Sequence, residues 1–135
     1  MVSLGPFSPW PRPDRPMLSS LATSARGMST QQRFLEVISS NIANAETTRT
    51  PEGGPYQREV AVASGGSVQV MRDASPGRMQ YDPGHPDANA DGFVLYPNVD
   101  LNTELVDLMV ARRVFEANAT AFQAAKSMLR KSLEI

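Results

Sequence analysis

Hydrophobic residues recur in alternating steps of three and four near both ends of the chain, and this spacing predicts two long helices. The first covers residues 17–46 and the second residues 99–135, and neither stretch contains a proline. Such a narrow stripe is typical of helices that pair as a coiled coil. The predicted seam positions are Leu18, Leu21, Ala25, Met28, Gln32, Leu35, Ser39 and Ile42 in the first helix, and Leu101, Leu105, Leu108, Arg112, Phe115, Ala119, Phe122, Lys126, Leu129 and Leu133 in the second.

Between the helices the hydrophobic period changes to two, which predicts strands. Residues 56–63 and 68–70 alternate, and the SGGS sequence at 64–67 between them is a turn signal, so this stretch predicts a β-hairpin. A second pair of short strands is expected around residues 79–82 and 92–96. Residues 47–98 are therefore predicted to form a β-rich central region.

The first sixteen residues hold five of the eleven prolines, and proline lacks an amide donor and fixes φ. Residues 1–16 are therefore predicted to form a disordered, proline-rich tail. Taken together, the sequence predicts an α+β fold in which long N- and C-terminal helices pair as a coiled coil beside a small middle region rich in β-hairpins.

Composition narrows the classes of partner. The chain has 13 basic and 14 acidic side chains and no basic block, which argues against nucleic acid as a partner. No apolar run approaches the roughly 18 residues of a membrane span, so no direct membrane insertion is expected. The N-terminus does not resemble a cleaved signal peptide, and the absence of cysteine removes disulfides and thiolate chemistry.

One segment, DPGHPDANADGF at 82–93, raises the question of a metal site. Asp87, Asn89 and Asp91 are spaced like the first ligands of a helix–loop–helix calcium loop. The twelfth loop position is Asn98 where a bidentate Glu is required, and the prolines before Asp87 forbid an entering helix. A turn is the preferred interpretation, and a small calcium-binding module remains an alternative.

No catalytic constellation is visible. The chain has a single histidine, His85, so neither a zinc site nor a Ser-His pair finds the partners that it needs. The glycine pairs at 53–54 and 65–66 match no phosphate-binding fingerprint. The prediction is a protein that is not an enzyme, with no catalytic residues, no metal ligands and no cofactor.

Two helices of this length cannot bury all their apolar surface within one monomer that has so few residues between them. Some of that surface is expected to meet other copies or partner proteins. This indicates a self-assembling structural subunit, and a coiled-coil adaptor remains a second alternative. Polar residues within the seams, such as Arg112, are interpreted as groups that set register or await partners in the assembly.

Three stretches carry a resemblance to a known family. Ser40-Asn41-Ile42-Ala43-Asn44 resembles the N-terminal signature of the bacterial flagellar axial proteins of rod and hook. The stretches TTRT and GGPY at 47–50 and 53–56, YDPGHPDANADGFVLYPNVD at 81–100, and the sequence from 103 to 135 are similar to the proximal-rod members of that family. The similarity covers most of residues 17–135.

The resemblance implies a structural subunit of the basal-body proximal rod, which polymerises into the drive-shaft for motility. It implies as partners other copies of the chain, other rod proteins, the base of the basal body and the flagellar type III export apparatus. The implied location is the periplasmic rod, reached without a cleaved signal peptide. An export route of this kind agrees with the N-terminus described above.

The resemblance also implies interface residues at matching positions: Asn41, Ile42 and Asn44, and in the last helix Arg112, Phe115, Glu116 and Asn118. The seams add Leu21, Met28, Leu35, Leu105, Leu108, Phe122 and Leu129. Amides at Asn41 and Asn44 suit capping of a helix end against a neighbour's backbone. Arg112 and Glu116 are spaced for an i,i+4 ion pair.

Overall fold

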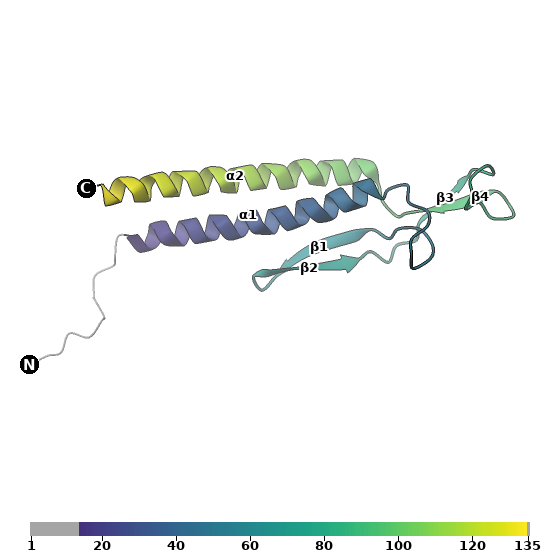
Figure 1. Ribbon diagram of the computed structural model, residues 1–135, viewed down its shortest axis with the longest axis horizontal. Coiled ribbons are helices and arrows are strands. Elements are labelled where there is room, and N and C mark those ends of the chain that lie inside the picture. Colours follow the sequence, from purple (N-terminus) through teal and green to yellow (C-terminus); the bar gives the residue numbers. More distant parts are fainter. Residues whose placement is uncertain (1–13, 135) are drawn as a thin grey trace, which may run out of the picture.

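The computed structural model describes residues 14–134, which form two long helices and two separate β-hairpins (Figure 1). Helix α1 (Asp14–Ala43) and helix α2 (Leu101–Leu133) lie side by side and antiparallel. Strands β1 (Glu59–Ser64) and β2 (Ser67–Arg72) form one hairpin, and β3 (Arg78–Tyr81) and β4 (Phe93–Tyr96) form the other. This arrangement confirms the α+β prediction.

The helix ends differ slightly from the predicted bounds. Helix α1 begins three residues before the expected start at 17, because Pro16 falls in the first turn, where no amide donor is needed. Of the predicted tail, residues 14–16 are therefore helical, and 1–13 lie outside the described residues. Residues 44–46, predicted as helix, form a turn, and α2 starts after Asp100, whose carboxylate accepts a hydrogen bond from the Asn102 amide at 3.0 Å.

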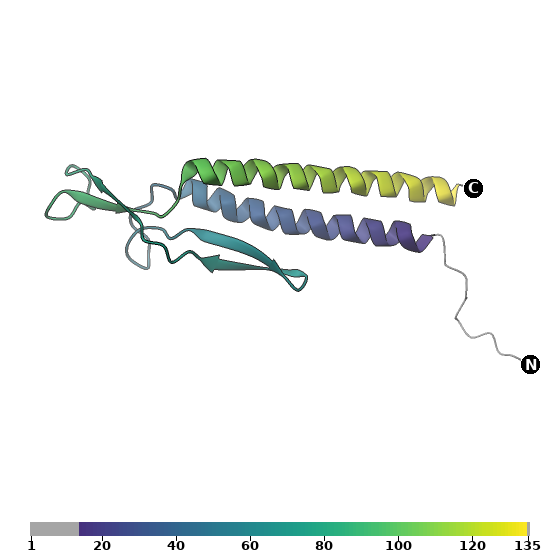
Figure 2. The same ribbon diagram turned by 180° about the vertical axis from the view of Figure 1, so that it is seen from behind.

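The two hairpins occupy different places. The β1–β2 hairpin folds back along α1. The view from behind also shows this hairpin beside α1 (Figure 2). The β3–β4 hairpin projects beyond the end of the helix pair, away from both termini. Ser64 pairs with Ser67 across a two-residue turn in which Gly65 and Gly66 both have positive φ, the geometry that hairpin turns prefer.

The buried apolar residues are spread along the molecule and do not form one cluster. Val94 of the projecting strand β4 is fully buried at 0% exposure, and the others in this half of the molecule are Val37 in α1, Ala45 in the turn after α1, and Pro97 and Val99 before α2. Farther along the helix pair, the buried residues are few and small, and Ala125 is one of them. None of the helices within residues 14–134 is long and apolar enough to cross a membrane.

Half of the predicted seam positions are half-buried, and the other half are exposed. Among the exposed ones, Leu101 and Leu133 lie at the two ends of α2, and the residues before them are exposed as well. The remaining exposed positions are Leu18, Ala25, Gln32 and Ser39 of α1 and Leu105, Arg112 and Lys126 of α2. At each of these positions the preceding residue is buried or half-buried instead, so the seam is rotated about the helix axis by one residue. The buried and half-buried positions are Leu21, Ser24, Met28, Gln31, Leu35, Ile38 and Ile42 in α1, and Glu104, Leu108, Ala111, Phe115, Asn118, Phe122, Ala125 and Leu129 in α2.

Small residues explain this shift. Gly27 lies so close to α2 that a Cβ built on it would be 2.8 Å from the side-chain atoms of Asn118. Ser24, Ala111 and Ala125 are buried in the same seam. Small side chains let the helices approach closely, and the long charged side chains of Arg112 and Lys126 would hold the helices apart in the same positions.

The first prediction concerns this close approach. Gly27→Leu should lower the free energy of unfolding by about 1–3 kcal/mol, because the added side chain overpacks the seam against Asn118. Ala25→Leu is the matched control, since Ala25 is exposed and its substitution should be close to neutral. Urea unfolding followed by circular dichroism measures both. Equal effects of the two variants would show that the seam runs through Ala25 as first predicted.

Candidate functional site

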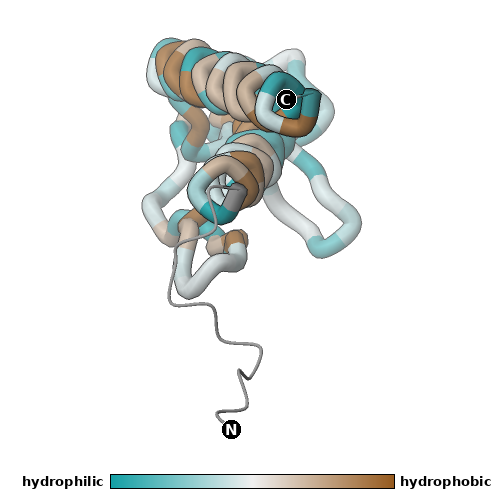
Figure 3. The backbone as a smooth tube through the Cα atoms, turned by 90° about the vertical axis from the view of Figure 1, so that its left-hand side faces the viewer, coloured by the Kyte–Doolittle hydropathy of each residue, from teal (hydrophilic) through white to brown (hydrophobic). Residues whose placement is uncertain are grey.

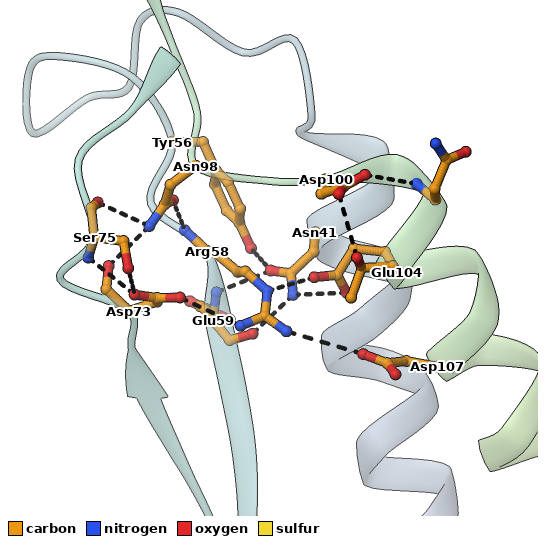
Figure 4. A network of polar contacts seen from close by, with 12 residues as sticks. Asn41, Tyr56, Arg58, Glu59, Asp73, Ser75, Asn98, Asp100, Glu104 and Asp107 are labelled. Carbon is orange, nitrogen blue, oxygen red and sulfur yellow. Dashed lines mark hydrogen bonds and ion pairs between the residues drawn. The ribbon is translucent and has the colours of Figure 1, made fainter.

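A buried polar cluster joins the two helices to the hairpins (Figure 4). Its centre is the carboxylate of Glu104, in the first turn of α2, which is 1% exposed. Asn41, near the end of α1, is equally buried. The Asn41 amide nitrogen donates to Glu104 Oε2 at 3.3 Å, so the two helices are linked by a hydrogen bond that water does not reach.

Asn41 also binds the start of β1. Its amide nitrogen donates to the carbonyl of Glu59 at 2.7 Å, and its carbonyl oxygen accepts from the Glu59 amide at 2.9 Å. The Tyr56 hydroxyl donates to the same oxygen at 2.7 Å. The backbone that Asn41 was predicted to bind in a neighbouring subunit is therefore, in this structure, the backbone of its own chain.

Arg58 is the cation of the cluster. Its Nε donates to Glu104 Oε1 at 2.5 Å and its Nη1 to Asp73 Oδ2 at 3.3 Å, while Asp107 lies 3.9 Å away on the next turn of α2. One guanidinium thus faces carboxylates from α2 and from the segment after β2. A planar group with several donors suits this position because it can serve several acceptors at once.

The surroundings of the cluster shift the pKa values of two of its residues, Arg58 and Tyr56. The hydrogen bond to Glu104 raises the pKa of Arg58 further above its ordinary value, so its charge is permanent. Burial raises the pKa of Tyr56, whose hydroxyl therefore stays protonated and able to donate. No buried side-chain nitrogen or oxygen among residues 14–134 lacks a hydrogen-bond partner. The cluster is therefore fully satisfied, as a structural clamp requires.

Asn98 ties the second hairpin to the first. Its carbonyl oxygen accepts from the Arg58 amide at 2.7 Å, and its amide nitrogen donates to the carbonyls of Asp73 and Ser75 at 3.0 and 3.1 Å. Because Asn98 lies between β4 and α2, it fixes the direction in which the β3–β4 hairpin leaves the helices (Figure 4).

A second group of side-chain contacts joins the loop after α1 to the loop between β3 and β4. The Thr48 hydroxyl donates to Asp87 Oδ2 at 2.7 Å, and the Arg49 guanidinium pairs with Asp87 Oδ1. The Thr48 hydrogen bond, followed by the hydrogen bond and the charge of Arg49, holds the pKa of Asp87 below its ordinary value.

The calcium alternative is not supported by the loop geometry. Asn89 uses its side-chain oxygen to accept the amides of Asp91 and Phe93 at 3.0 and 2.9 Å, which is an Asx turn. Asp87 faces Thr48 and Arg49 instead of a shared centre with Asp91. Over residues 14–134 no group of three or more His, Cys, Asp or Glu side chains is placed to hold a metal ion.

The predicted interface residues fall into two groups. One group lies in the seam between α1 and α2 and is half-buried: Leu21, Met28, Leu35, Ile42, Leu108, Phe115, Asn118, Phe122 and Leu129. Asn44, also half-buried, donates its amide nitrogen to the Ser40 carbonyl at 2.8 Å and so caps the end of α1. The other group, Leu105, Arg112 and Glu116, is exposed on α2. Within the single chain described, Arg112 and Glu116 form no ion pair with each other, and pairing between subunits stays a prediction.

Sequence reasoning missed Arg58 and Glu104. Arg58 was one residue of an alternating strand, and Glu104 stood beside the predicted seam position Leu105. One feature of the sequence could have revealed Glu104: the predicted seam contained two charged residues, Arg112 and Lys126. Moving the seam to Ala111 and Ala125 removes them and brings Glu104 into it, where a carboxylate demands a cation.

A further apolar stripe on α2 is left uncovered. Val106 and Val110 are 58% and 56% exposed, although both are hydrophobic. The stripe continues in steps of three and four along the flank of α2 beside the seam, where Val110 and Val114 also line a groove of about 300 Å³ with residues of α1 and β1. Its members are Val106, Val110, Val114, Ala117, Ala121, Ala124 and Met128. In the view along the helix pair, brown hydrophobic segments recur along α2 (Figure 3).

Comparison with known families identifies both helical regions. Residues 21–49 match the family described as flagella basal body rod protein. Residues 90–135 match the family described as flagellar basal body rod FlgEFG protein C-terminal. The two matches include most of α1 and all of α2.

Curated relatives are similar over nearly their whole length. The flagellar basal-body rod protein FlgC of Borreliella burgdorferi is 36% identical, over 88% of this chain and 97% of the relative. The protein of the same name from Bacillus subtilis is 38% identical, over 86% and 95%. That of Salmonella typhimurium is 33% identical, over 88% and 97%.

The second prediction tests the clamp. Glu104→Ala should destabilise the chain by about 3–5 kcal/mol, because it leaves Arg58 and Asn41 without their buried partner. Asp107→Ala is the control: its carboxylate is half-exposed and 3.9 Å from Arg58, so its loss should cost about 1 kcal/mol or less. Urea unfolding compares the two. A cost for Glu104→Ala no larger than that of the control would contradict the clamp.

The third prediction concerns Asp87. Because its pKa is lowered in the folded state, Asp87 contributes stability above its ordinary pKa, and this is lost as the pH falls through the lowered value. Thr48→Val should move the pKa of Asp87 upward, towards its ordinary value, since it removes the largest cause of the shift. Titration of the Asp87 carboxyl carbon by NMR measures this. Ser75→Ala is the distant control and should leave the pKa of Asp87 unchanged. If Thr48→Val also leaves the pKa of Asp87 unchanged, the Thr48 hydrogen bond is not the cause of the shift.

Proposed function

The chain belongs to the family of flagellar basal-body rod proteins FlgC, and we propose that it acts by polymerising through its terminal helices into the proximal part of the rod. It is a structural subunit of the basal-body rod. Its task is mechanical, because a rod transmits torque only if each subunit is held firmly by its neighbours.

The observation that carries the proposal is the uncovered stripe from Val106 to Met128 on α2. A monomer leaves a contiguous apolar stripe in water only at a cost, and burial of such surface in an interface recovers about 25 cal/mol per Å². Neighbouring subunits are the occupants that a polymer supplies. The seam with α1 is then the inner contact of each subunit, and the stripe is the contact between subunits.

Within this proposal the predicted interface residues take two roles. Those in the seam, such as Leu108 and Phe122, hold α1 against α2 and present the stripe. Those exposed on α2, which are Leu105, Arg112 and Glu116, face neighbours directly. An interface with a mixed border of this kind gains specificity from the charges and affinity from the apolar centre.

The division of the chain follows the same logic. The helical regions, predicted as 17–46 and 99–135, form the shaft. Within the central region 47–98, the β1–β2 hairpin lies along α1 and the β3–β4 hairpin projects towards surrounding proteins. The chemistry proposed is assembly and not catalysis, since the polar cluster is satisfied internally and holds the parts together. Partners are other copies, other rod proteins and the base of the basal body.

The proposed location is the rod within the periplasm, reached through the flagellar type III export apparatus without a cleaved signal. The architecture suits export in an unfolded state, because the local turns and long helices can form again quickly after passage. The absence of cysteine suits an oxidising compartment, since no disulfide can mispair there.

The fourth prediction tests incorporation through the stripe. Val110→Asp should abolish motility and reduce the chain in isolated basal bodies by at least about tenfold, because a charge in the subunit contact remains unpaired when buried. Ser127→Asp is the control, because it places the same side chain at an exposed position of α2 outside the stripe.

Quantitative mass spectrometry of basal bodies measures the amount of the chain relative to other rod proteins. Equal incorporation of Val110→Asp and the control would refute the role of the stripe. Absence of the unmodified chain from complete basal bodies would refute the rod function itself.

A further inference from the structure

The β3–β4 hairpin has two unlike faces. Pairing places Gln80 opposite Val94 on one face, where Val94 is fully buried and Gln80 is exposed. Met79 pairs with Leu95 and Tyr81 with Phe93, and directly opposite residues share one face. All four of these side chains are exposed, and Tyr81 is 64% exposed. We name this face, formed by Met79, Tyr81, Phe93 and Leu95, the tip patch.

The tip patch is ordered by its own contacts. The rings of Tyr81 and Phe93 meet edge to face with centroids 5.4 Å apart. Gly92 has φ +84°, and a Cβ there would lie 2.8 Å from the Tyr81 ring, so the chain passes tightly against this aromatic pair. The two rings are therefore packed against each other on a hairpin that protrudes from one end of the molecule (Figure 1), and packed aromatic side chains are common anchors of interfaces.

The opposite end of the molecule carries a groove of matching character. It lies between the start of α1 and the end of α2, and its volume is about 470 Å³. The lining side chains are small, apart from Met128: Ser19, Ser20, Thr23, Ser24, Ala121, Ala124, Ala125 and Met128. We name it the end groove. Small side chains along the groove leave room for aromatic rings, and its Ser and Thr hydroxyls can form hydrogen bonds with a Tyr hydroxyl.

The charges beside the two surfaces are opposite. Asp82 follows Tyr81 directly, and Asp91 lies two residues before Phe93. By helical spacing, Arg15 lies one turn before Ser19 and Lys131 one turn after Met128. None of these four residues takes part in an ion pair among residues 14–134. The acids at the tip patch are therefore available to the bases at the end groove.

We propose that the tip patch of one copy docks into the end groove of a second copy, with Tyr81 and Phe93 as anchors and Asp82 and Asp91 facing Arg15 and Lys131. The contact is heterologous, because two different surfaces of the same chain meet, and it therefore propagates in one direction. It deepens the proposed function and rests on it, since it specifies the occupant of the far end of the stripe on α2, where Ala121, Ala124 and Met128 also line the end groove.

The fifth prediction uses cross-linking, for which the chain is suited because it has no cysteine. Full-length Met79→Cys and Ala124→Cys are mixed and treated with a short bismaleimide, and the peptides are identified by mass spectrometry. The proposal expects a joined peptide pair from positions 79 and 124 of different molecules. Met71→Cys replaces Met79→Cys in the control, because Met71 is an equally exposed methionine on the other hairpin.

Charge reversal tests the electrostatic match. Asp91→Lys in the Met79→Cys chain should lower the yield of the joined pair by about tenfold, and Lys131→Asp in the Ala124→Cys chain should restore it. Glu46→Lys is the matched control, since it changes the charge by the same amount at an exposed residue that, like Asp91, takes part in no ion pair among residues 14–134. Equal yields from positions 79 and 71, or a loss that Lys131→Asp does not restore, would overturn the proposal.

A chain that carries both Met79→Cys and Ala124→Cys is then cross-linked within isolated basal bodies. A product that joins position 79 of one copy to position 124 of a second copy supports the proposal. A product with a different rod protein, or no product although the chain is present, overturns it and leaves the rod function standing. Absence of the chain from basal bodies would instead refute the proposed function, so the two failures are distinguishable.

Discussion

The contact between Glu104 and Arg58 is the constraint on which the rest of the structure depends. A carboxylate that is 1% exposed in the first turn of α2 is tolerated only with a cation and hydrogen-bond donors around it. Arg58 and Asn41 supply these, and in doing so they bring the start of β1 against both helices. The backbone of Arg58 in turn holds Asn98, which sets where the second hairpin leaves. One buried charge therefore orients α1, α2 and both hairpins.

The molecule is consequently uneven in its packing. The most deeply buried side chains, Glu104, Val94, Asn41 and Pro97, all belong to the end of the molecule that holds the polar cluster and the hairpins. Along the shaft the seam relies on small residues such as Gly27, Ala111 and Ala125, which bury little area but permit a close approach of the helices. The far end of the helix pair thus has a weak core of its own, and in a polymer it gains the missing contacts from neighbours.

This division suits the work of a rod subunit. A junction with satisfied polar groups gives each subunit one defined shape, while the exposed apolar surface on α2 and at the tip is the surface that we propose for contacts between subunits. Since the tip and the end groove are different surfaces, contacts made through them extend the polymer and do not close a symmetric dimer. The charges at the two ends favour one orientation of neighbouring copies over the reverse.

The amino-acid sequence by itself determined the order of elements, both hairpins, the helical pairing and the family, because periods of two and of three to four follow directly from backbone geometry. Only the tertiary structure decided the register of the seam and the partners of Glu104. A shift by one residue changes a helical stripe little as a pattern, but it decides whether Ala111 or Arg112 faces α1. Likewise, the meeting of Asn41, Arg58 and Glu104 depends on contacts between residues far apart in the chain, and no local spacing encodes such contacts.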